Sequence, residues 1–462
     1  LIPFIFVLNR ITDIKHFIIS GFIWGCTYYL TVIFWLATNL GTTPFIGMLS
    51  MILAVLYGSL TFIIICILMK LIKNLFPKNW YWFFPLVWVS IEYIRNMDLL
   101  SGGPWTALAN TQLDFLILIQ NAEITGIYGI SFWIVLVNIL LYNWLVRPYS
   151  ENIIKATLIF FLPWVIGIWL MPTSNDDSIP SIDIALIQPN IHLDQKWNPG
   201  AVRDNIQSLL TASKPAIENN VDLIVWPETA TSGYILQGNK YYIKWIQRSL
   251  NHSKLISGIP YYNEEGSEKK YYNSAVFIQS DSIINIYHKI KLVPMAEYIP
   301  LSDYFPSLNQ LNLGQANFTK GMDFTIMDVN NIKCAVMICF ESTLPSLNRK
   351  FVNAGAEVLL YVVNDGWYEN PPGPQQHAKQ AVFRAIENRR PVVRCTNTGI
   401  SMIIDSGGNI IHELPLNEKG IIQATIKPKN IATFYSRHGD IFAQLNIMIL
   451  LLMIFGRMIR KR

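Results

Sequence analysis

The sequence predicts an α-helical membrane bundle joined to a layered α/β domain, and two observations lead to this fold class. The chain of 462 residues is 52% hydrophobic and only 15% charged, whereas a soluble protein carries about 25% charged residues. The charges are also unevenly placed, because only 14 of the 67 lie in residues 1–171. An apolar first part and a charged second part are therefore expected, and disorder, a collagen-like chain and a small disulfide scaffold are excluded.

Six stretches are candidate membrane spans, because a span needs about 20 predominantly apolar residues. They cover residues 17–38, 45–69, 80–94, 115–146, 153–171 and 441–455. The third is short and contains Pro85, so we expect a kinked or partly re-entrant segment there. Residues 1–171 are thus predicted to form a membrane bundle. We interpret the apolar residues 1–8 as the end of a helix whose beginning, with further N-terminal spans, is missing.

Basic residues near the span ends predict the orientation of the bundle. They form four clusters, at Arg10 and Lys15, at Lys70, Lys73 and Lys78, at Arg147 and Lys155, and at Arg457, Arg460, Lys461 and Arg462. With six spans, all four clusters fall on one side, which the positive-inside rule identifies as the cytoplasm. Residues 172–440 then lie on the opposite face, and the last helix (441–462) ends in a basic cytoplasmic tail. These flanks explain the net charge of +5 without a nucleic-acid partner.

Two charged residues of the apolar part invite both a structural and a functional interpretation. Glu92 and Arg95 are three residues apart, so on a helix they share a face and can pair. A structural ion pair near a helix end is the simpler interpretation. Trp105 follows a Gly-Gly-Pro turn at the outer interface, where it either sits at headgroup depth or lines a lipid entrance.

From Ser181 onward short β-rich runs alternate with amphipathic helices, which predicts a layered α/β sandwich. Strands are expected at 182–188, 222–226, 255–259, 274–279, 283–287, 332–339, 358–363, 392–395 and 402–404, and helices at 202–219, 240–251, 347–354 and 375–388. A β-hairpin is expected around Asp281 and Ser282. Residues 172–180 are predicted to be a linker and residues 181–440 the α/β domain.

The five cysteines form no disulfide or metal framework. No C-x-x-C occurs and the seven histidines are scattered, so we find no zinc spacing and expect no metal. Cys26 and Cys66 lie in apolar stretches, where a cysteine usually behaves as a small buried hydrophobe.

Glu228, Lys289 and Cys339 each lie where an apolar predicted strand ends, and α/β folds place their sites at strand ends. Taken singly, they have simpler interpretations: a helix cap, a solvated strand end and a buried apolar residue. Together they supply a base, a cation and a nucleophile, which acyl transfer through a thioester requires. A turn near a helix N-terminus is expected to lower the pKa of Cys339.

Several motifs give the chain a family resemblance. They are W-P-E-T at 226–229, Y-x-K-x-x-L-V-P-x-x-E-Y at 287–298, I-C-F-E at 338–341 and N-D-G-W-Y at 364–368. These motifs resemble the signatures of the carbon–nitrogen hydrolase (nitrilase) superfamily. With membrane spans on both sides of them, almost the whole chain resembles the apolipoprotein N-acyltransferase family. The resemblance implies a nitrilase-like α-β-β-α sandwich and makes residues 181–440 the catalytic domain.

The family's catalytic triad falls on Glu228, Lys289 and Cys339. In the implied mechanism Glu228 is the general base, the Cys339 thiolate attacks an ester of a phospholipid, and Lys289 donates to the oxyanion. The α-amine of the N-terminal diacylglyceryl-cysteine of an apolipoprotein then attacks the thioester, which is the last step of lipoprotein maturation. No cofactor is implied.

The resemblance also implies the partners and the location. The expected partners are a phospholipid acyl donor, phosphatidylethanolamine, and a diacylated apolipoprotein acceptor. The expected protein is a monomer in the bacterial inner membrane, with its catalytic domain on the periplasmic face.

Supporting residues are implied by the same resemblance. Lys289 and Lys291 share one face of a strand because side chains repeat with period two, but the family's spacing selects Lys289 and pairs it with Glu297. The supporting positions carried over are Trp197, Asn273, Glu297, Glu341 and Trp367. Glu297 and Glu341 would hold the lysine and orient the site.

Three aromatic residues near the motifs receive separate expectations. Trp197 and Trp367 lie beside loops rich in proline and glycine, so we expect lipid-contacting lid residues, the alternative being ordinary core or interface aromatics. Phe340 departs from the family, which usually has tyrosine after the nucleophile, so a hydroxyl hydrogen bond is lost there.

Two other functions are compatible with parts of this pattern. A membrane-tethered amidase or nitrilase would use the same triad with water as the acceptor, but a tether needs one span rather than about six. A transporter or structural membrane protein with an inactive outer domain would not need the three reactive residues, and its pathway would carry more ionisable groups.

Overall fold

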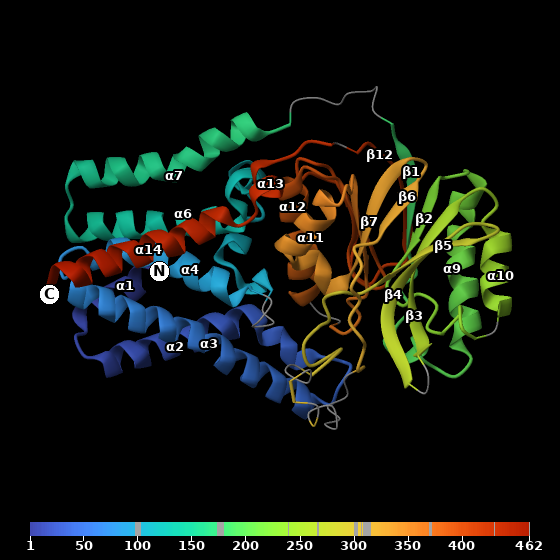
Figure 1. Ribbon diagram of the computed structural model, residues 1–462, viewed down its shortest axis with the longest axis horizontal. Helices are drawn as coiled ribbons and strands as arrows, with labels where there is room; N and C mark the ends of the chain where they lie inside the picture. The colour runs from blue at the N-terminus through green and yellow to red at the C-terminus, as the bar shows by residue number, and fades with distance from the viewer. Residues whose placement is uncertain are drawn as a thin grey trace. The chain divides into compact units, whose positions relative to one another are not determined.

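The computed structural model describes the chain except residues 98–102, 173–179, 239, 266–267, 300–303, 306, 308–315, 369–371, 429 and 462 (Figure 1). The chain divides into two compact units. The helical unit comprises residues 1–38, 43–172 and 433–462, and the α/β unit comprises residues 39–42 and 173–432. The predicted linker, 172–180, lies outside the described residues except at its two ends.

Five helical segments in the described part of the chain are long and apolar enough to cross a membrane. They are Ile14–Thr38 (α2, Ile14–Ile33, with the 3-10 helix η1, Phe34–Thr38), Pro44–Leu75 (α3), Ala122–Val146 (α6), Ser150–Leu170 (α7) and Ile441–Arg460 within α14 (Ile441–Lys461). The chain opens with a shorter helix, α1 (Ile2–Arg10). Five of the six predicted spans thus correspond to helices of spanning length.

Residues 80–94, predicted as a short and kinked or partly re-entrant span, are helical but shorter than the other spans. This segment forms a 3-10 turn, η2 (Trp80–Phe83), followed by α4 (Phe84–Arg95) of 12 residues. Pro85 stands in the first turn of α4, where its missing N–H needs no partner and its fixed φ favours helix initiation. The predicted span 115–146 likewise divides into a short helix, α5 (Leu116–Ile119), and α6.

Glu92 and Arg95 each have a partner other than the one the sequence predicted. Glu92 is buried, and its Oε1 accepts the backbone N–H of Leu108 at 2.8 Å. Arg95 donates from its guanidinium to the hydroxyl of Tyr29. Glu92 therefore satisfies the backbone of an irregular segment, η5 (Leu108–Gln112), which an apolar environment requires.

The outer faces of the spanning helices carry apolar side chains. On α7 these are Leu158, Phe161, Val165, Ile168 and Trp169, which are 55–86% exposed. A water-soluble protein rarely exposes so continuous an apolar surface, so these faces indicate contact with lipid.

Trp105, for which headgroup depth and a lipid entrance were both expected, packs on Trp35, with the ring centroids 5.4 Å apart.

Two six-stranded sheets face each other in the α/β unit, in the orders β12-β1-β2-β3-β4-β5 and β11-β10-β9-β8-β7-β6. The first contains β1 (Ile182–Gln188), β2 (Leu223–Trp226), β3 (Lys254–Glu265), β4 (Glu268–Ile278), β5 (Ile283–His288) and β12 (Gly420–Ile426). The second contains β6 (Ile326–Val329), β7 (Ile332–Ile338), β8 (Val358–Val363), β9 (Val392–Thr396), β10 (Ser401–Ile404) and β11 (Ile410–Leu414).

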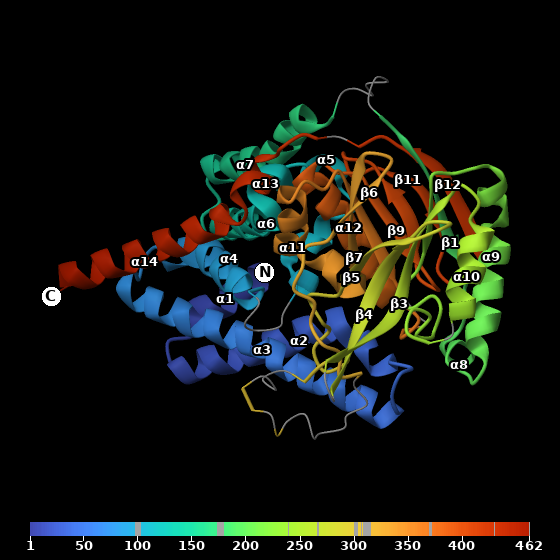
Figure 2. The same cartoon turned by 45° about the vertical axis from the view of Figure 1, so that its right-hand side comes forward.

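Helices cover both outer faces of this pair of sheets. The first sheet is covered by α9 (Ala201–Glu218) and α10 (Lys240–Ser249), and the second by α11 (Pro345–Asn353) and α12 (Gly373–Asn388) (Figures 1 and 2). Between the sheets, the thiol of Cys395 on β9 lies 3.2 Å from the carbonyl of Val225 and 3.3 Å from that of Ile187. This arrangement confirms the predicted α-β-β-α sandwich.

All nine predicted strands and all four predicted helices of this unit are present, and β4 and β5 form the expected hairpin. The three unpredicted strands, β6, β11 and β12, all lie at sheet edges. An edge strand has one unpaired side and tolerates polar residues, so its sequence pattern is weak. β11, for example, has four exposed residues out of five.

The boundary between the units differs from the predicted one near the C-terminal end. Residues 433–440 belong to the helical unit, whereas the sequence assigned 181–440 to the α/β domain. Their short helix, α13 (Phe434–His438), buries Tyr435 completely against Gly126, where α6 departs from helical φ and ψ. Because this segment is largely polar, its sequence does not indicate that contact.

Gly258 allows β3 to lie close to the turn that follows β2. The N–H of Gly258 donates to the carbonyl of Pro227 at 3.1 Å, and its carbonyl accepts from Ala230 at 2.8 Å. A Cβ at position 258 would lie 2.5 Å from the Cα of Glu228. Only glycine fits here without moving the turn that carries Glu228.

We expect Gly258→Ala to lower the Tm of the purified protein by about 2–10 °C, since overpacking costs about 1–3 kcal/mol. Gly456→Ala is the matched control, because a Cβ at position 456 has no neighbour within 4 Å. Thermal unfolding of both variants in detergent tests this, and an unchanged Tm for Gly258→Ala would contradict the packing argument.

Candidate active site

Glu228 is delivered by a buried strand that stops abruptly. All four residues of β2 are buried, Pro227 ends the strand, and Thr229 adopts a left-handed conformation with φ of 47°. Glu228 is only 5% exposed, and its Oε1 accepts from Asn273 Nδ2 at 2.7 Å. Among the described residues none donates to Oε2 of Glu228, which is also buried. One carboxylate oxygen is therefore held and the other is available to accept a proton.

Lys289 lies directly after β5, and its ammonium is paired with carboxylates. The Nζ atom is 2.9 Å from Glu297 Oε2 and 3.7 Å from Glu228 Oε1, and the side chain is 1% exposed. Asn273 on β4 links the two acids, because its Nδ2 also donates to Glu297 Oε1 at 2.9 Å. The N–H of Val293 donates to Glu297 Oε2 at 2.8 Å, so each oxygen of Glu297 has at least one partner.

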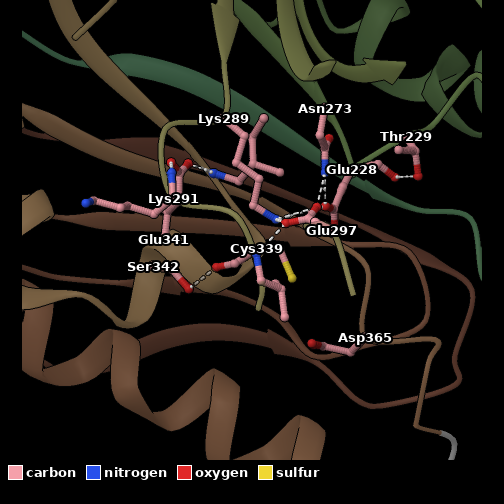
Figure 3. Close-up of polar contacts among 12 residues, drawn as sticks. Glu228, Thr229, Asn273, Lys289, Lys291, Glu297, Cys339, Glu341, Ser342 and Asp365 are labelled. Atoms are coloured by element: carbon pink, nitrogen blue, oxygen red, sulfur yellow. Dashed lines mark hydrogen bonds and ion pairs between the residues drawn. The ribbon is translucent and has the colours of Figure 1, made fainter. Parts of the chain in front are cut away.

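Cys339 occupies a strained turn at the end of β7. Its φ is +51°, a region that costs a non-glycine residue energy and persists only when neighbours enforce it. It begins a 3-10 helix, η7 (Cys339–Thr343). The hydroxyl of Ser342 donates to the Cys339 carbonyl at 2.7 Å, and His377 Nε2 lies 3.3 Å from the same oxygen. Figure 3 shows the sulfur of Cys339 beside the cluster of Glu228, Lys289 and Glu297.

Glu341 connects the lysine segment to the cysteine turn. It is fully buried, and its Oε1 accepts the N–H groups of Ile290 and Lys291 at 2.8 and 2.9 Å. Its Oε2 accepts the N–H of Ile338 at 2.8 Å, and the hydroxyl of Tyr287 donates to the carboxylate at 2.8 Å. One side chain thus fixes the end of β5 in the first sheet against the end of β7 in the second.

The charges of this cluster shift one another's proton affinities. Burial raises the pKa of Glu228, opposed by the charge of Lys289. Burial alone would lower the pKa of Lys289, but Glu297 and Glu228 raise it, so the lysine stays charged. Burial likewise raises the pKa of Glu341 to about 7.

The expectation of a lowered pKa for Cys339 is wrong for the resting site. Burial and the carboxylate of Glu228 hold the pKa of the thiol well above its usual range, although Lys289 opposes them. Asp365 and Glu297 raise it further. These buried acids outweigh the favourable field of a short 3-10 turn, so the thiol needs a base to become a nucleophile.

The remaining predicted residues fall into two groups. Asn273 and Glu297 lie in the cluster, whereas Trp197 and Trp367 are 48% and 41% exposed and line a cavity of about 620 Å³ with residues of the 39–42 segment. The core interpretation of the two tryptophans is therefore wrong. Phe340 is half-buried in η7, and its carbonyl accepts the hydroxyl of Thr343 at 2.8 Å.

Sequence reasoning missed a buried network beneath the cysteine turn. His377 Nδ1 lies 2.7 Å from Asp365 Oδ1, and Arg394 donates to Asp365 Oδ2 at 2.7 Å. Although burial alone would raise it, Arg394 and His377 hold the pKa of Asp365 below its usual range. Only Asp365 lies in one of the motifs named above, at 364–368, and the sequence spacing does not indicate that it meets His377 and Arg394.

Lys196 was also missed. It is 1% exposed and donates to the carbonyl of Glu228 at 3.1 Å and to Thr229 Oγ1 at 2.9 Å. It immediately precedes Trp197 in the sequence, and a lysine is ordinarily expected to be exposed. In the part of the chain that the structure describes, no group of three or more His, Cys, Asp or Glu side chains could hold a metal ion.

Comparisons with known proteins identify the families that both parts of the chain match. Residues 183–435 match the carbon-nitrogen hydrolase family, and residues 1–140 match the apolipoprotein N-acyltransferase N-terminal domain. Among solved structures, Nit3 of Saccharomyces cerevisiae, a member of branch 10 of the nitrilase superfamily, aligns at 20% identity and a TM-score of 0.43, over 55% of this chain and 93% of that chain.

Three curated relatives cover most of the chain. Apolipoprotein N-acyltransferase of Geobacter metallireducens is 33% identical over 92% of this chain and 83% of its own length. The protein of the same name from Chlorobaculum tepidum is 30% identical over 82% and 77%, and apolipoprotein N-acyltransferase 1 of Treponema denticola is 29% identical over 98% and 89%. The chain therefore belongs to the apolipoprotein N-acyltransferase family, with an α/β unit of the carbon-nitrogen hydrolase type.

Proposed function

We propose that this protein transfers an acyl chain from a phospholipid to the α-amino group of the N-terminal diacylglyceryl-cysteine of an apolipoprotein, through a thioester on Cys339. The observation that carries the proposal is the half-buried Cys339 beside the buried Glu228 and Lys289, an arrangement in which one carboxylate oxygen of Glu228 has no donor among the described residues. The names of the curated relatives support the same activity.

In the first half-reaction the thiol becomes acylated. Glu228 accepts the thiol proton on its unpaired oxygen, and the Cys339 sulfur attacks the ester carbonyl of the phospholipid. The ammonium of Lys289, held by Glu297, donates to the oxyanion, where a fixed positive charge is most effective. The C–O bond then breaks, and the lysophospholipid leaves with the proton that Glu228 had taken.

In the second half-reaction the acceptor amine replaces the sulfur. The α-amine attacks the thioester carbonyl and loses a proton to Glu228, and the C–S bond breaks to form the amide. Cys339 regains its proton, so the site returns to its resting state. Splitting the transfer into two steps lets one site use two lipid substrates in turn.

The two exposed tryptophans support a lipid substrate. Trp197 and Trp367 line the same cavity, and the ring of Trp367 lies against Gly41, where an added Cβ would be 2.7 Å away. An exposed indole offers an apolar face and an N–H at once, which suits an interface between lipid and water. We assign these residues to the lid over the acyl chain.

A multi-pass location in the bacterial inner membrane, with the α/β unit on the periplasmic side, completes the proposal. The four basic clusters share one side only if the chain crosses six times, and the five long helices leave one crossing to α4. Although α4 is short, it packs against α3, α6 and α14, and protein surroundings permit a short or broken crossing. The domain division proposed from the sequence, an N-terminal bundle, a catalytic domain and a C-terminal helix, fits this path.

The acyl donor is proposed to be phosphatidylethanolamine and the working form a monomer. Incubating the purified protein with phosphatidylethanolamine should add one acyl chain to the peptide containing Cys339, as measured by mass spectrometry. Cys339→Ala should give no adduct and no N-acylation of a diacylated lipopeptide, whereas Cys26→Ala should behave as the unmodified protein. N-acylation by Cys339→Ala would refute the mechanism, and hydrolysis of the thioester with no transfer to the lipopeptide would refute the acceptor.

A reporter of periplasmic export tests the orientation. Fused after Asn175, it should be active only outside the cytoplasm, because the proposed orientation requires that position to be on the outer side. Fused after Pro148, between α6 and α7, the same reporter should be active only inside. Cytoplasmic activity after Asn175 would overturn the orientation.

Removing either tryptophan should weaken use of the lipid but not the chemistry of the thiol. We expect Trp197→Ala and Trp367→Ala to slow acyl-enzyme formation at low phosphatidylethanolamine by about tenfold, with alkylation of Cys339 by iodoacetamide nearly unchanged. Tyr241→Ala, an exposed aromatic on α10, serves as the control. Equal loss of acylation and alkylation would assign the tryptophans to folding instead.

A further inference from the structure

Lys196 is a second lysine buried beside Glu228, and the proposed triad gives it no role. Among the described residues its ammonium donates to the carbonyl of Glu228 at 3.1 Å and to the hydroxyl oxygen of Thr229 at 2.9 Å, and it lies 5.9 Å from the centroid of the Trp197 ring. A buried ammonium with these neutral partners is costly, so its presence calls for an explanation in the charge of its surroundings.

Both the backbone and the side chain of Lys196 are held in place. Its carbonyl accepts from Asn205 Nδ2 on α9 at 3.1 Å, and its side chain runs inward from a short helix, α8 (Leu193–Lys196). The hydroxyl of Thr229 donates to the Glu228 carbonyl at 2.8 Å, so the ammonium and this hydroxyl converge on the same oxygen. Together they hold the left-handed turn at Thr229, whose φ of 47° needs such support.

The charges that face Glu228 come from four elements. Lys289 follows β5, Glu297 lies in the loop after it, Lys196 ends α8, and the thiol of Cys339 begins η7; Asn273 on β4 is neutral. Glu228 is thus faced by two cations, Lys289 and Lys196, and by the carboxylate of Glu297, while Glu341 adds a further buried carboxylate near Lys289. Removing the charge of Lys196 leaves one cation opposite these acids, which favours the protonated form of Glu228.

We propose that Lys196 is a positioning residue for Glu228, which holds the turn that carries the carboxylate and supplies the positive charge that keeps it ionised. This role rests on the proposed function of Glu228 as the base. Removing the charge leaves Glu228 protonated over a wider pH range, so Glu228 can no longer accept the thiol proton there.

The direction of the pH effect follows from the same charges. Burial and the charge of Glu297 raise the pKa of Glu228, whereas Lys289, Asn273 and Lys196 lower it, Lys289 most strongly. Burial lowers the pKa of Lys196 to about 8, and Glu228 opposes this, so the lysine is charged below that pH. Alkylation of Cys339 should rise with pH as Glu228 ionises, and losing Lys196 should move this rise to higher pH.

The test measures alkylation of Cys339 by iodoacetamide between pH 5 and 9, with mass spectrometry of the full-length protein in detergent. The acid limb of the pH profile is the range in which the alkylation rate rises with pH. For Lys196→Gln, which keeps a hydrogen-bond donor but no charge, we expect this acid limb to move to higher pH by about one unit. Alkylation below the limb should then be about tenfold slower. Lys196→Arg keeps the charge and should titrate as the unmodified protein. Lys214→Gln removes a lysine that is 73% exposed and should also leave the limb in place.

Thermal unfolding separates positioning from folding. A lower Tm for Lys196→Gln with an unmoved acid limb would overturn the proposal, as would a limb that Lys196→Arg shifts equally. If Lys196→Gln does not fold, Lys196→Met replaces it under the same expectations. No phospholipid takes part, so failure here leaves the acyl-adduct experiment, and with it the proposed function, to be judged separately.

Discussion

The need to satisfy three buried carboxylates determines the architecture of the site. Glu228, Glu297 and Glu341 are each less than one-tenth exposed, and an unpaired carboxylate in such surroundings is expensive. Asn273 and Lys289 hold Oε1 of Glu228 and both oxygens of Glu297, whereas Oε2 of Glu228 has no donor among the described residues; backbone N–H groups with Tyr287 satisfy Glu341. The ends of β5 and β7 supply Lys289 and the Ile338 N–H, and β4 supplies Asn273 from its middle. The chemistry is built from the same contacts that hold the sheets in register.

The strained cysteine turn depends on this framework. A non-glycine residue at φ +51° persists only if its neighbours enforce it. Glu341 holds the N–H before the turn, while Ser342 and the network of His377 with Asp365 hold the carbonyl after it. The sulfur is thus placed by groups other than Glu228 and Lys289, and under the proposed function the face beside these two residues receives the substrate.

Sequence reasoning succeeded where a signal is local and failed where it depends on the fold. Buried central strands such as Ile182–Gln188 and Val358–Val363 follow from apolar runs alone, and the motifs selected Glu228, Lys289 and Cys339. The edge strands were not predicted because polar residues are tolerated there. The burial of Lys196 and His377 was not predicted because distant segments of the chain determine whether a polar or charged side chain is buried. The pKa of Cys339 was predicted in the wrong direction because the acids around it come from separate loops.

Glu341 bridges the two sheets, and this has a consequence for how substrates exchange. Any separation of the sheets would pull the Ile290 and Lys291 amides away from the Ile338 amide and release the cysteine from its geometry. The sandwich must therefore behave as a rigid body during a catalytic cycle with two successive lipids. Under the proposed function, the lysophospholipid leaves and the lipopeptide arrives past the exposed side chains at the rim of the site, such as Trp197 and Trp367. Motions of exposed side chains are fast and disturb little packing. Turnover would then be limited by the rim, and the interior would keep the same geometry for both halves of the reaction.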